Sequence, residues 1–297
     1  MEAKMTSRFL TVILKSNLLF FGFRIFLKTL RSMEEKIRLQ KGNTIIVDLQ
    51  GKLVPLVQEL HRSNEICFTS VPAVGSEDGN NWRPESKLEG QWVYEKFQEE
   101  PDFVIETSRR VADDYQKVTA RAEAFSSSLV DVEEGRKWVF GSLLKWSGPI
   151  VETGYLDHRE VMQLTEDFER VIKQKGKGFF GYAHGNTIGD HIFIGNNGTV
   201  YLFGMRIVLR PGKGYYDFLR ALDWLLLKTP NDERTVELFI GWMKSNLSGE
   251  NWDDVKLVFA LRCIGILGWD MLHRGDEGSS DFSRKKDILL RFIRREY

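Results

Sequence analysis

The first third of the chain carries short apolar runs that are separated by polar turns. Phe9–Leu14 is a β-branched and aromatic run, and Leu18–Leu30 is a second apolar stretch that is broken by Gly22. Both patterns are typical of strands. Ser32 is followed three residues later by Glu35, which is the capping-box spacing and predicts the start of a helix.

The same mixture of patterns continues to a polar break. Val54–His61 has a helical pattern, Glu65–Ser70 is typical of a strand, and Gln91–Phe97 alternates as a half-buried strand does. Gly75–Gly90 is dense in Gly, Asn, Ser and Pro, so it predicts a loop. The polar segment Glu99–Asp102 then indicates a boundary near residue 100.

Beyond this boundary, apolar positions recur at helical spacing. In Leu156–Lys173 the residues Val161, Leu164, Phe168 and Ile172 fall on one stripe, which predicts a helix with one buried face. The other segments with a helical pattern are Phe103–Leu129, Tyr215–Lys228, Glu233–Leu247, Asp253–Leu272 and Phe282–Arg295.

One β-hairpin is embedded among these helices. Ile192–Ile194 and Thr199–Phe203 are apolar runs, and an Asn-Gly turn lies between them, which is a strong hairpin signal. Strands first and helices later predict an α+β fold of two lobes. We expect a small β-rich N-terminal lobe of strands plus one helix (residues 1–100) and a large helical C-terminal lobe with the hairpin inside it (residues 101–297).

Composition limits the partners and the location. The 297 residues suffice for two packed lobes. Lys+Arg and Asp+Glu both number 42, and this zero net charge gives no electrostatic case for nucleic acid as a partner. The two cysteines, Cys67 and Cys263, form neither a metal-binding pair nor a disulfide framework, so we expect a reducing, cytoplasmic location.

The apolar N-terminal segment does not predict a membrane span. Phe9–Leu27 is rich in Leu, Phe and Ile, but Lys15, Asn17 and Arg24 interrupt it. No apolar run approaches the roughly 20 residues that a span requires. The segment also lacks a small-residue cleavage signature, which argues against a signal peptide. Two short strands are the preferred interpretation, and a membrane-associated segment is the alternative.

The most informative residues surround the hairpin. The loop His184-Gly185-Asn186 precedes it, with His191 five residues after Asn186, and Gly204 stands at its far end. This order of parts resembles the aminoglycoside and choline kinase-type phosphotransferases, in which a His-Gly-Asp loop, an Asn, a hairpin and a metal-binding Asp follow one another. The resemblance implies a protein kinase-like fold with a catalytic-loop-like segment at residues 182–208. It also implies ATP or GTP with Mg²⁺ as cofactors and a small-molecule acceptor.

The resemblance further assigns nucleotide-binding residues. Lys28 looks like the phosphate-binding Lys, and Glu35, or its neighbour Glu34, looks like the helical partner of that Lys. Glu95 and Phe97 lie in a segment similar to the strand that enters the hinge between the lobes. The plain alternatives are an ordinary edge-strand Lys and a solvated pair of acidic residues that suits the helix dipole.

Three chemical positions depart from the family pattern. Asn186 stands where the family has the base Asp, and an amide cannot accept the proton, although general-base help is typically worth ~10²–10⁴-fold. His191 replaces the metal-binding Asn, and imidazole is a poor ligand for Mg²⁺. Gly204 replaces the second metal-binding Asp and has no side chain. The catalytic motifs are therefore degenerate.

Asp190 is the carboxylate that could compensate for these losses. With Asn186 and His184 it forms the candidate catalytic set, and with His191 it forms the candidate metal-binding set. The alternatives are that Asp190 is a turn residue and that His184 only supports the loop.

Other charged residues allow two interpretations each. Arg206, Arg210 and Lys213 form a basic group after the hairpin, which either receives an anionic substrate or phosphate or is a solvated loop. Asp217 is interpreted as a helix cap. Acidic residues of the later helices either attract a cationic acceptor or are helix-surface charges; they are Asp223, Asp232, Glu233, Asp253 and Asp254.

Three functions remain open at this level. The preferred one is a pseudokinase that keeps the fold and binds a nucleotide or a protein partner. The alternative is an active ATP- or GTP-dependent phosphotransferase that acts on a small hydroxylated acceptor through a non-standard loop. The third is an unrelated α+β binding protein, in which the hairpin would not border the main cleft.

Overall fold

The computed structural model describes most of the chain after residue 55. Pro55–Tyr297 form one compact unit, separate from Met1–Val54. The described residues are 53, 56–71, 73–75, 82–84, 89–97, 99–125, 130–185, 191–203, 207–229, 232–274 and 280–297. The strands and the helix expected before residue 40 lie outside these ranges.

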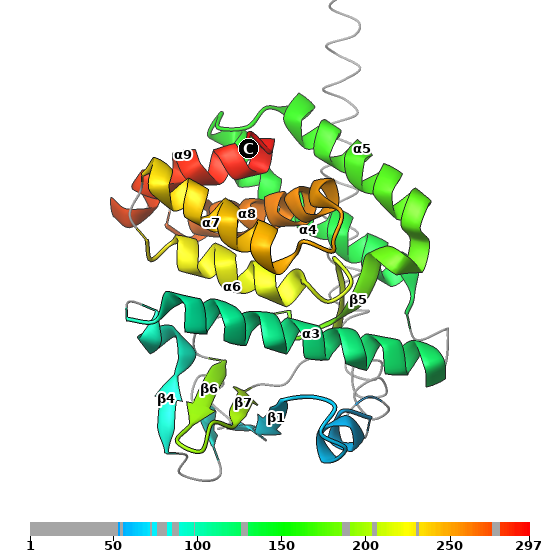
Figure 1. The fold of residues 1–297 in the computed structure, drawn as a ribbon. Coiled ribbons are helices and arrows are strands. Elements are labelled where there is room, and N and C mark those ends of the chain that lie inside the picture. Colours follow the sequence, from blue (N-terminus) through cyan, green and yellow to red (C-terminus); the bar gives the residue numbers. More distant parts are fainter. Residues whose placement is uncertain are drawn as a thin grey trace, which may run out of the picture. The chain divides into compact units, whose positions relative to one another are not determined.

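The described part is α+β, with more helix than strand (Figure 1). Its helices are α3 (Pro101–Phe125), α4 (Val132–Glu152), α5 (His158–Lys175), α6 (Tyr216–Leu226), α7 (Glu233–Asn246), α8 (Trp252–Arg274) and α9 (Ser280–Arg294), together with the 3-10 helices η2 (Val93–Lys96) and η3 (Gly176–Phe179). Its strands are β1 (Phe68–Val71), β2 (Ala73–Gly75), β3 (Trp82–Pro84), β4 (Gly90–Trp92), β5 (Phe180–Ala183), β6 (Ile192–Gly195), β7 (Val200–Phe203) and β8 (Val208–Pro211).

The strands form three small sheets. The largest has the order β1-β7-β6-β4, in which β1 pairs parallel with β7 and the other neighbours are antiparallel. The predicted hairpin is confirmed as β6–β7, and it joins the β1 and β4 strands from the earlier part of the chain. β2 pairs with β3, and β5 pairs with β8.

Helix α3 lies between the four-stranded sheet and the remaining helices (Figure 1). On one side, the backbone N–H of Cys67, just before β1, donates to Asp114 Oδ2 at 2.6 Å. On the other side, the backbone N–H of Tyr182 in β5 donates to Thr119 Oγ1 at 2.8 Å. Both acceptors are buried in α3, so this helix fixes β1 and β5 to one frame.

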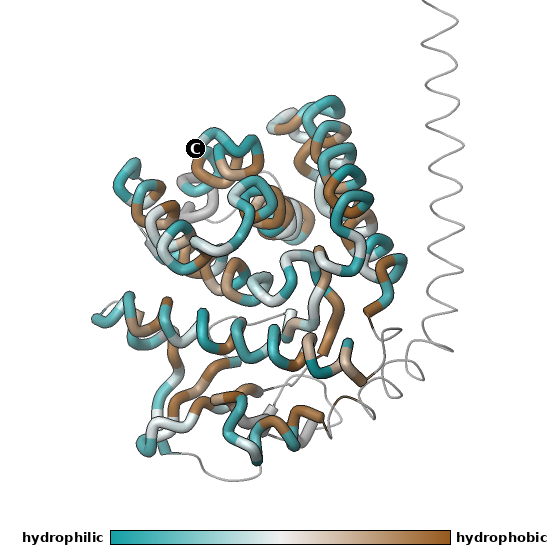
Figure 2. Tube along the Cα trace, turned by 45° about the vertical axis from the view of Figure 1, so that its right-hand side comes forward, coloured by the Kyte–Doolittle hydropathy of each residue, from teal (hydrophilic) through white to brown (hydrophobic). Residues whose placement is uncertain are grey.

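The helical pattern of α5 is confirmed. Asp157 and Glu160 form a reciprocal capping box at its start, and Leu164, Phe168 and Ile172 are buried on one face. Hydrophobic and hydrophilic positions alternate along the turns of the helices, as expected for helices with one buried face (Figure 2). Within the described residues, no helix is long and apolar enough to cross a membrane.

Two predicted elements differ from the structure, and one helix was not predicted. Gln91–Phe97 is a strand only to Trp92, after which η2 begins. Gly75–Gly90 was predicted to be a loop, but it contains β3. This strand pairs with β2, which ends at Gly75. Helix α4 was not predicted, because Gly135, Gly141, Gly148 and Pro149 lower the helix propensity of its sequence. The predicted division into two lobes near residue 100 stays a prediction; α3 begins at Pro101.

Helices α4 and α8 cross at Gly268. A Cβ at this position would lie 2.1 Å from the carbonyl oxygen of Trp146. We expect Gly268→Ala to lower the free energy of unfolding by about 1–3 kcal/mol, because the two backbones must separate. The matched control is Gly141→Ala in α4, where a Cβ would meet nothing within 4 Å. Alanine there should be neutral or stabilising by up to ~1 kcal/mol. Urea denaturation measures both, and equal midpoints for the two variants would contradict the close crossing.

Candidate functional site

The turn after β5 is held by a buried carboxylate. The backbone N–H of His184 donates to Asp217 Oδ2 at 2.6 Å, and the backbone N–H of Gly185 donates to Asp217 Oδ1 at 2.8 Å. Asp217 lies in the first turn of α6 and is 1% exposed. Hydrogen bonds to an ionised acceptor are stronger than neutral ones, so α6 fixes the backbone of this turn.

Asp217 is a site residue that the sequence interpretation missed. It was assigned as a helix cap, but its carboxylate binds the His184–Gly185 turn 32 residues earlier in the chain. A signal was present in the sequence, because Asp217 stands between Tyr216 and Phe218 in an apolar, aromatic run that predicts burial. A carboxylate in such surroundings requires a buried donor.

The two histidines of the loop lie together. The ring centroids of His184 and His191 are 5.4 Å apart with an interplanar angle of 59°. His184 is 0% exposed, and His191 immediately precedes β6. The burial of His184 favours its interpretation as a support of the loop. The rings pack the end of β5 against the start of the hairpin.

Strand β8 closes the other side of the turn. Gly185 has φ +77°, and a Cβ there would lie 2.7 Å from Val208 Cγ2. Arg210 in β8 pairs with Gly181 in β5. Its guanidinium lies 4.0 Å above the ring of Trp138 in α4. Arg210 is therefore packed rather than part of a solvated loop, whereas Lys213 is exposed and Arg206 lies outside the described residues.

A buried ionic network lies on α6 and α8. Asp223 accepts from Arg220 Nη1 at 2.6 Å and from Arg262 Nε at 2.7 Å, and Arg262 Nη1 donates to Tyr216 Oη. Burial lowers the pKa of Arg220. Burial acts in the same direction on Arg262, but the charge of Asp223 and the oxygen of Tyr216 hold the pKa of Arg262 above its usual range.

The five acidic residues that were considered as attractors of a cationic acceptor all have partners within the described residues. Asp223 holds two arginines, and Asp232 accepts from the backbone N–H of Thr235. Glu233, Asp253 and Asp254 pair with Arg291, Lys256 and Lys175 respectively. These contacts favour structural roles over the attraction of a cationic acceptor.

Several predicted site residues lie outside the described residues. They are Lys28, Glu34, Glu35, Asn186, Asp190 and Gly204. In the described part, no group of three or more His, Cys, Asp or Glu side chains is placed to hold a metal ion. His191, which packs against His184, offers only imidazole, which does not fit Mg²⁺. The described residues therefore do not form a magnesium site.

The two predicted nucleotide-binding residues near residue 95 differ in their surroundings. The carboxylate of Glu95 is exposed and accepts from the backbone N–H of Trp92 at 3.3 Å. Phe97 is 8% exposed and packs edge-on against Trp242, with ring centroids 6.2 Å apart. The contacts shown for Phe97 are those of a core residue, and nucleotide binding by both residues stays a prediction.

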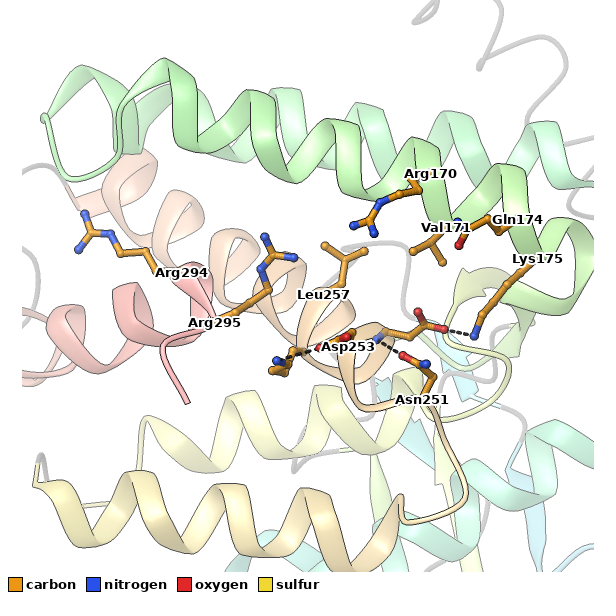
Figure 3. Close-up of a pocket in the computed structure, with 11 residues that line it drawn as sticks. Arg170, Val171, Gln174, Lys175, Asn251, Asp253, Leu257, Arg294 and Arg295 are labelled. Carbon is orange, nitrogen blue, oxygen red and sulfur yellow. Dashed lines mark hydrogen bonds and ion pairs between the residues drawn. The ribbon is translucent and has the colours of Figure 1, made fainter.

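A separate polar pocket of about 510 Å³ lies among α5, α8 and the end of α9 (Figure 3). Its cations are engaged by neighbours: Arg170 and Arg295 share Asp167, Lys175 pairs with Asp254, and Arg294 with Glu160. Because these charged groups pair with one another, this pocket is a weaker candidate for a ligand-binding site than the region of the His184–Gly185 turn.

Solved structures that are similar to this chain include two small-molecule kinases. An ethanolamine kinase from Plasmodium vivax has a TM-score of 0.47 and 11% sequence identity, over 86% of this chain and 76% of that one. A choline kinase from Cryptosporidium parvum Iowa II has a TM-score of 0.39 and 10% identity, over 83% of this chain and 77% of that one. No family model and no curated protein matches the sequence. Since both TM-scores lie below 0.5, we base the functional proposal on contacts within this chain.

Proposed function

We propose that this chain is a kinase-like protein of the small-molecule phosphotransferase type whose catalytic positions have degenerated, so that it binds a nucleotide or a protein partner. The observation that carries the proposal is the Asp217 carboxylate. It holds the backbone of the His184–Gly185 turn between the β5–β8 pair and the β6–β7 hairpin. A turn whose backbone is fixed in this way suits phosphoryl-transfer chemistry, which depends on positioning.

The identity of the loop residues supports the degenerate state. An amide at Asn186 orients a hydroxyl but accepts no proton, and Gly204 supplies no metal ligand. His191 packs against the buried His184, which favours a structural role for both rings. The backbone support of the site is thus present, while the acid–base and metal-binding groups differ from those that phosphoryl transfer uses.

The alternative function is an active phosphotransferase that uses Asp190 with ATP or GTP and Mg²⁺. It would act on a small hydroxylated acceptor. Asp190 is the residue that supports this alternative, because its carboxylate belongs to the same stretch of sequence. The two functions differ in one measurable respect: the degenerate site binds nucleotide without a divalent ion, whereas the active site requires the ion.

Thermal denaturation with ATP and GTP, each with and without Mg²⁺ or Mn²⁺, tests the proposal. A ligand at 100 times its Kd stabilises a protein by ~2.7 kcal/mol, which corresponds to a Tm increase of roughly 4–5 °C for a chain of this size. We expect such an increase in the absence of metal.

A metal-dependent increase that Asp190→Asn abolishes would instead establish the alternative, and an acceptor screen would follow. No response of the wild-type protein to either nucleotide would contradict nucleotide binding. A protein partner would then be sought by pull-down.

A further inference from the structure

Within the ranges that the structure describes, Arg210 is a packed cation that forms no ion pair with an acidic side chain. Its Nη1 donates to the carbonyl oxygen of Leu209 at 2.7 Å, which is its one hydrogen bond to the described residues. Its Nε is buried and donates to no atom of the described residues. Buried polar groups in proteins are nearly always paired, so an unpaired guanidinium nitrogen is available to a ligand or to an ordered water.

The unpaired edge of Arg210 lies beside the His184–Gly185 turn. A Cβ built on Gly185 would lie 3.5 Å from Nε and 3.7 Å from Nη2 of Arg210. The guanidinium plane is supported by the ring of Trp138 at 4.0 Å. Stacking fixes the orientation of the guanidinium N–H groups, which lowers the entropic cost of binding a ligand.

The neighbouring carboxylates are engaged elsewhere. Asp217 accepts from the two backbone N–H groups of the turn, and Asp223 accepts from Arg220 and Arg262. Glu134 lies within electrostatic range of Arg210, but no hydrogen bond or ion pair joins them in the described part of the chain. Burial lowers the pKa of Arg210, because the charged guanidinium loses hydration.

We propose that the free edge of Arg210 binds an oxyanion of the phosphate type beside the His184–Gly185 turn. Planar, two-pronged donors of this kind suit phosphate and carboxylate oxygens. The oxyanion is either the terminal phosphate of a nucleotide or an anionic group carried by the acceptor. The inference rests on the proposed function, since it names the chemistry bound at the same turn. It also predicts that a cationic acceptor is disfavoured there.

Titration with inorganic phosphate at constant ionic strength, with chloride as the balancing anion, tests this inference by calorimetry. Three proteins are compared: the wild type, Arg210→Met and Lys145→Met. Met keeps the apolar stem over Trp138 and removes the charge. Lys145 is the matched control, because it lies 4.0 Å above Trp146 in the same helix as Trp138 but is exposed.

We expect Arg210→Met to weaken phosphate binding roughly 10- to 100-fold, and Lys145→Met to leave it unchanged within twofold. Arg210→Lys, which keeps the charge but loses the fork, should recover only part of the affinity. Absence of phosphate binding by the wild type, or equal affinity of the wild type and Arg210→Met, would overturn the proposal. Urea denaturation of the free proteins separates loss of ligand from loss of fold, because removing an unpaired cation should not lower stability.

Nucleotide titrations distinguish the two sources of the oxyanion. If Arg210 binds the terminal phosphate, Arg210→Met should lose the preference of the wild type for ATP over ADP. If it binds an acceptor group, phosphate should still bind to protein saturated with ATP, and ATP affinity should not change in the variant. Phosphate binding that depends on Arg210, together with no nucleotide binding at all, would retain the oxyanion site and refute the nucleotide-binding function.

Discussion

Replacement of Asp223 by alanine is expected to lower the free energy of unfolding by about 3–5 kcal/mol, the usual cost of removing one partner from a buried ion pair. Asp223 is 0% exposed and holds Arg220 and Arg262, which are themselves largely buried. Without the carboxylate, two largely buried guanidinium groups would lose the charge that balances them. Loss of the Asp223 side chain should therefore reduce stability far more than its size suggests, because its negative charge balances the charges of two arginines.

Urea denaturation followed by circular dichroism measures this effect. The matched control is Asp253→Ala, which also removes a carboxylate that pairs with a basic side chain, Lys256, but whose own side chain is 85% exposed. Water replaces the lost interaction there, so its effect should stay below about 1 kcal/mol. Similar losses for the two variants would show that the Asp223 network does not stabilise the helical part of the chain.

The second large effect is expected for Asp217→Asn. The substitution keeps the shape of the side chain, but it removes the charge and directs an amide N–H₂ toward the backbone N–H of His184 or Gly185. One buried donor then loses its acceptor, and the other loses a charge-assisted bond. We expect a loss of about 2–4 kcal/mol in unfolding free energy. The nucleotide and phosphate responses should be lost as well, because the turn is no longer fixed.

Asp232→Asn is the control for Asp217→Asn, because the chemical change is identical and Asp232 also accepts from a backbone N–H, that of Thr235 at 2.8 Å. Asp232 is an exposed N-cap of α7, and Asn caps helices as well as Asp does. Its stability should equal that of the wild type. If Asp217→Asn also left the stability unchanged, the position of the turn would not depend on α6. This result would contradict the observation on which the proposed function rests.

These two aspartates show how the site and the fold are connected. Asp217 and Asp223 stand six positions apart in the sequence on one short helix, α6. One faces the His184 turn and the other faces α8 through Arg262. The helix thereby links the backbone of the candidate site to the core of the helical part, and a change at either residue should be felt at both. This linkage is consistent with a turn whose geometry is maintained, as the proposed function requires.

The sequence by itself determined the elements whose signals are local. The stripe of α5 with its capping box and the Asn-Gly turn of the β6–β7 hairpin depend on residues within a few positions of one another, so periodicity and turn chemistry suffice to predict them. The order of the loop, the hairpin and the helix that carries Asp217 is likewise local information. It was enough to indicate an α+β chain and to select the His184 region as the candidate site.

Only the tertiary structure decided the features that depend on distant partners. Helix α4 forms despite its glycines and Pro149, because Gly135 packs against Phe180 and Trp146 lies against Gly268. The role of Asp217 depends on backbone donors 32 and 33 residues away, and the packing of Arg210 depends on Trp138. Which side chains pack closely, and which buried charges are paired, depends on the segments that the fold brings together. The spacing of residues within one segment does not contain this information. For this reason Asp217, which was interpreted as a helix cap, supports the candidate site. Arg210, which was considered part of a solvated loop, is the residue proposed to bind an oxyanion there.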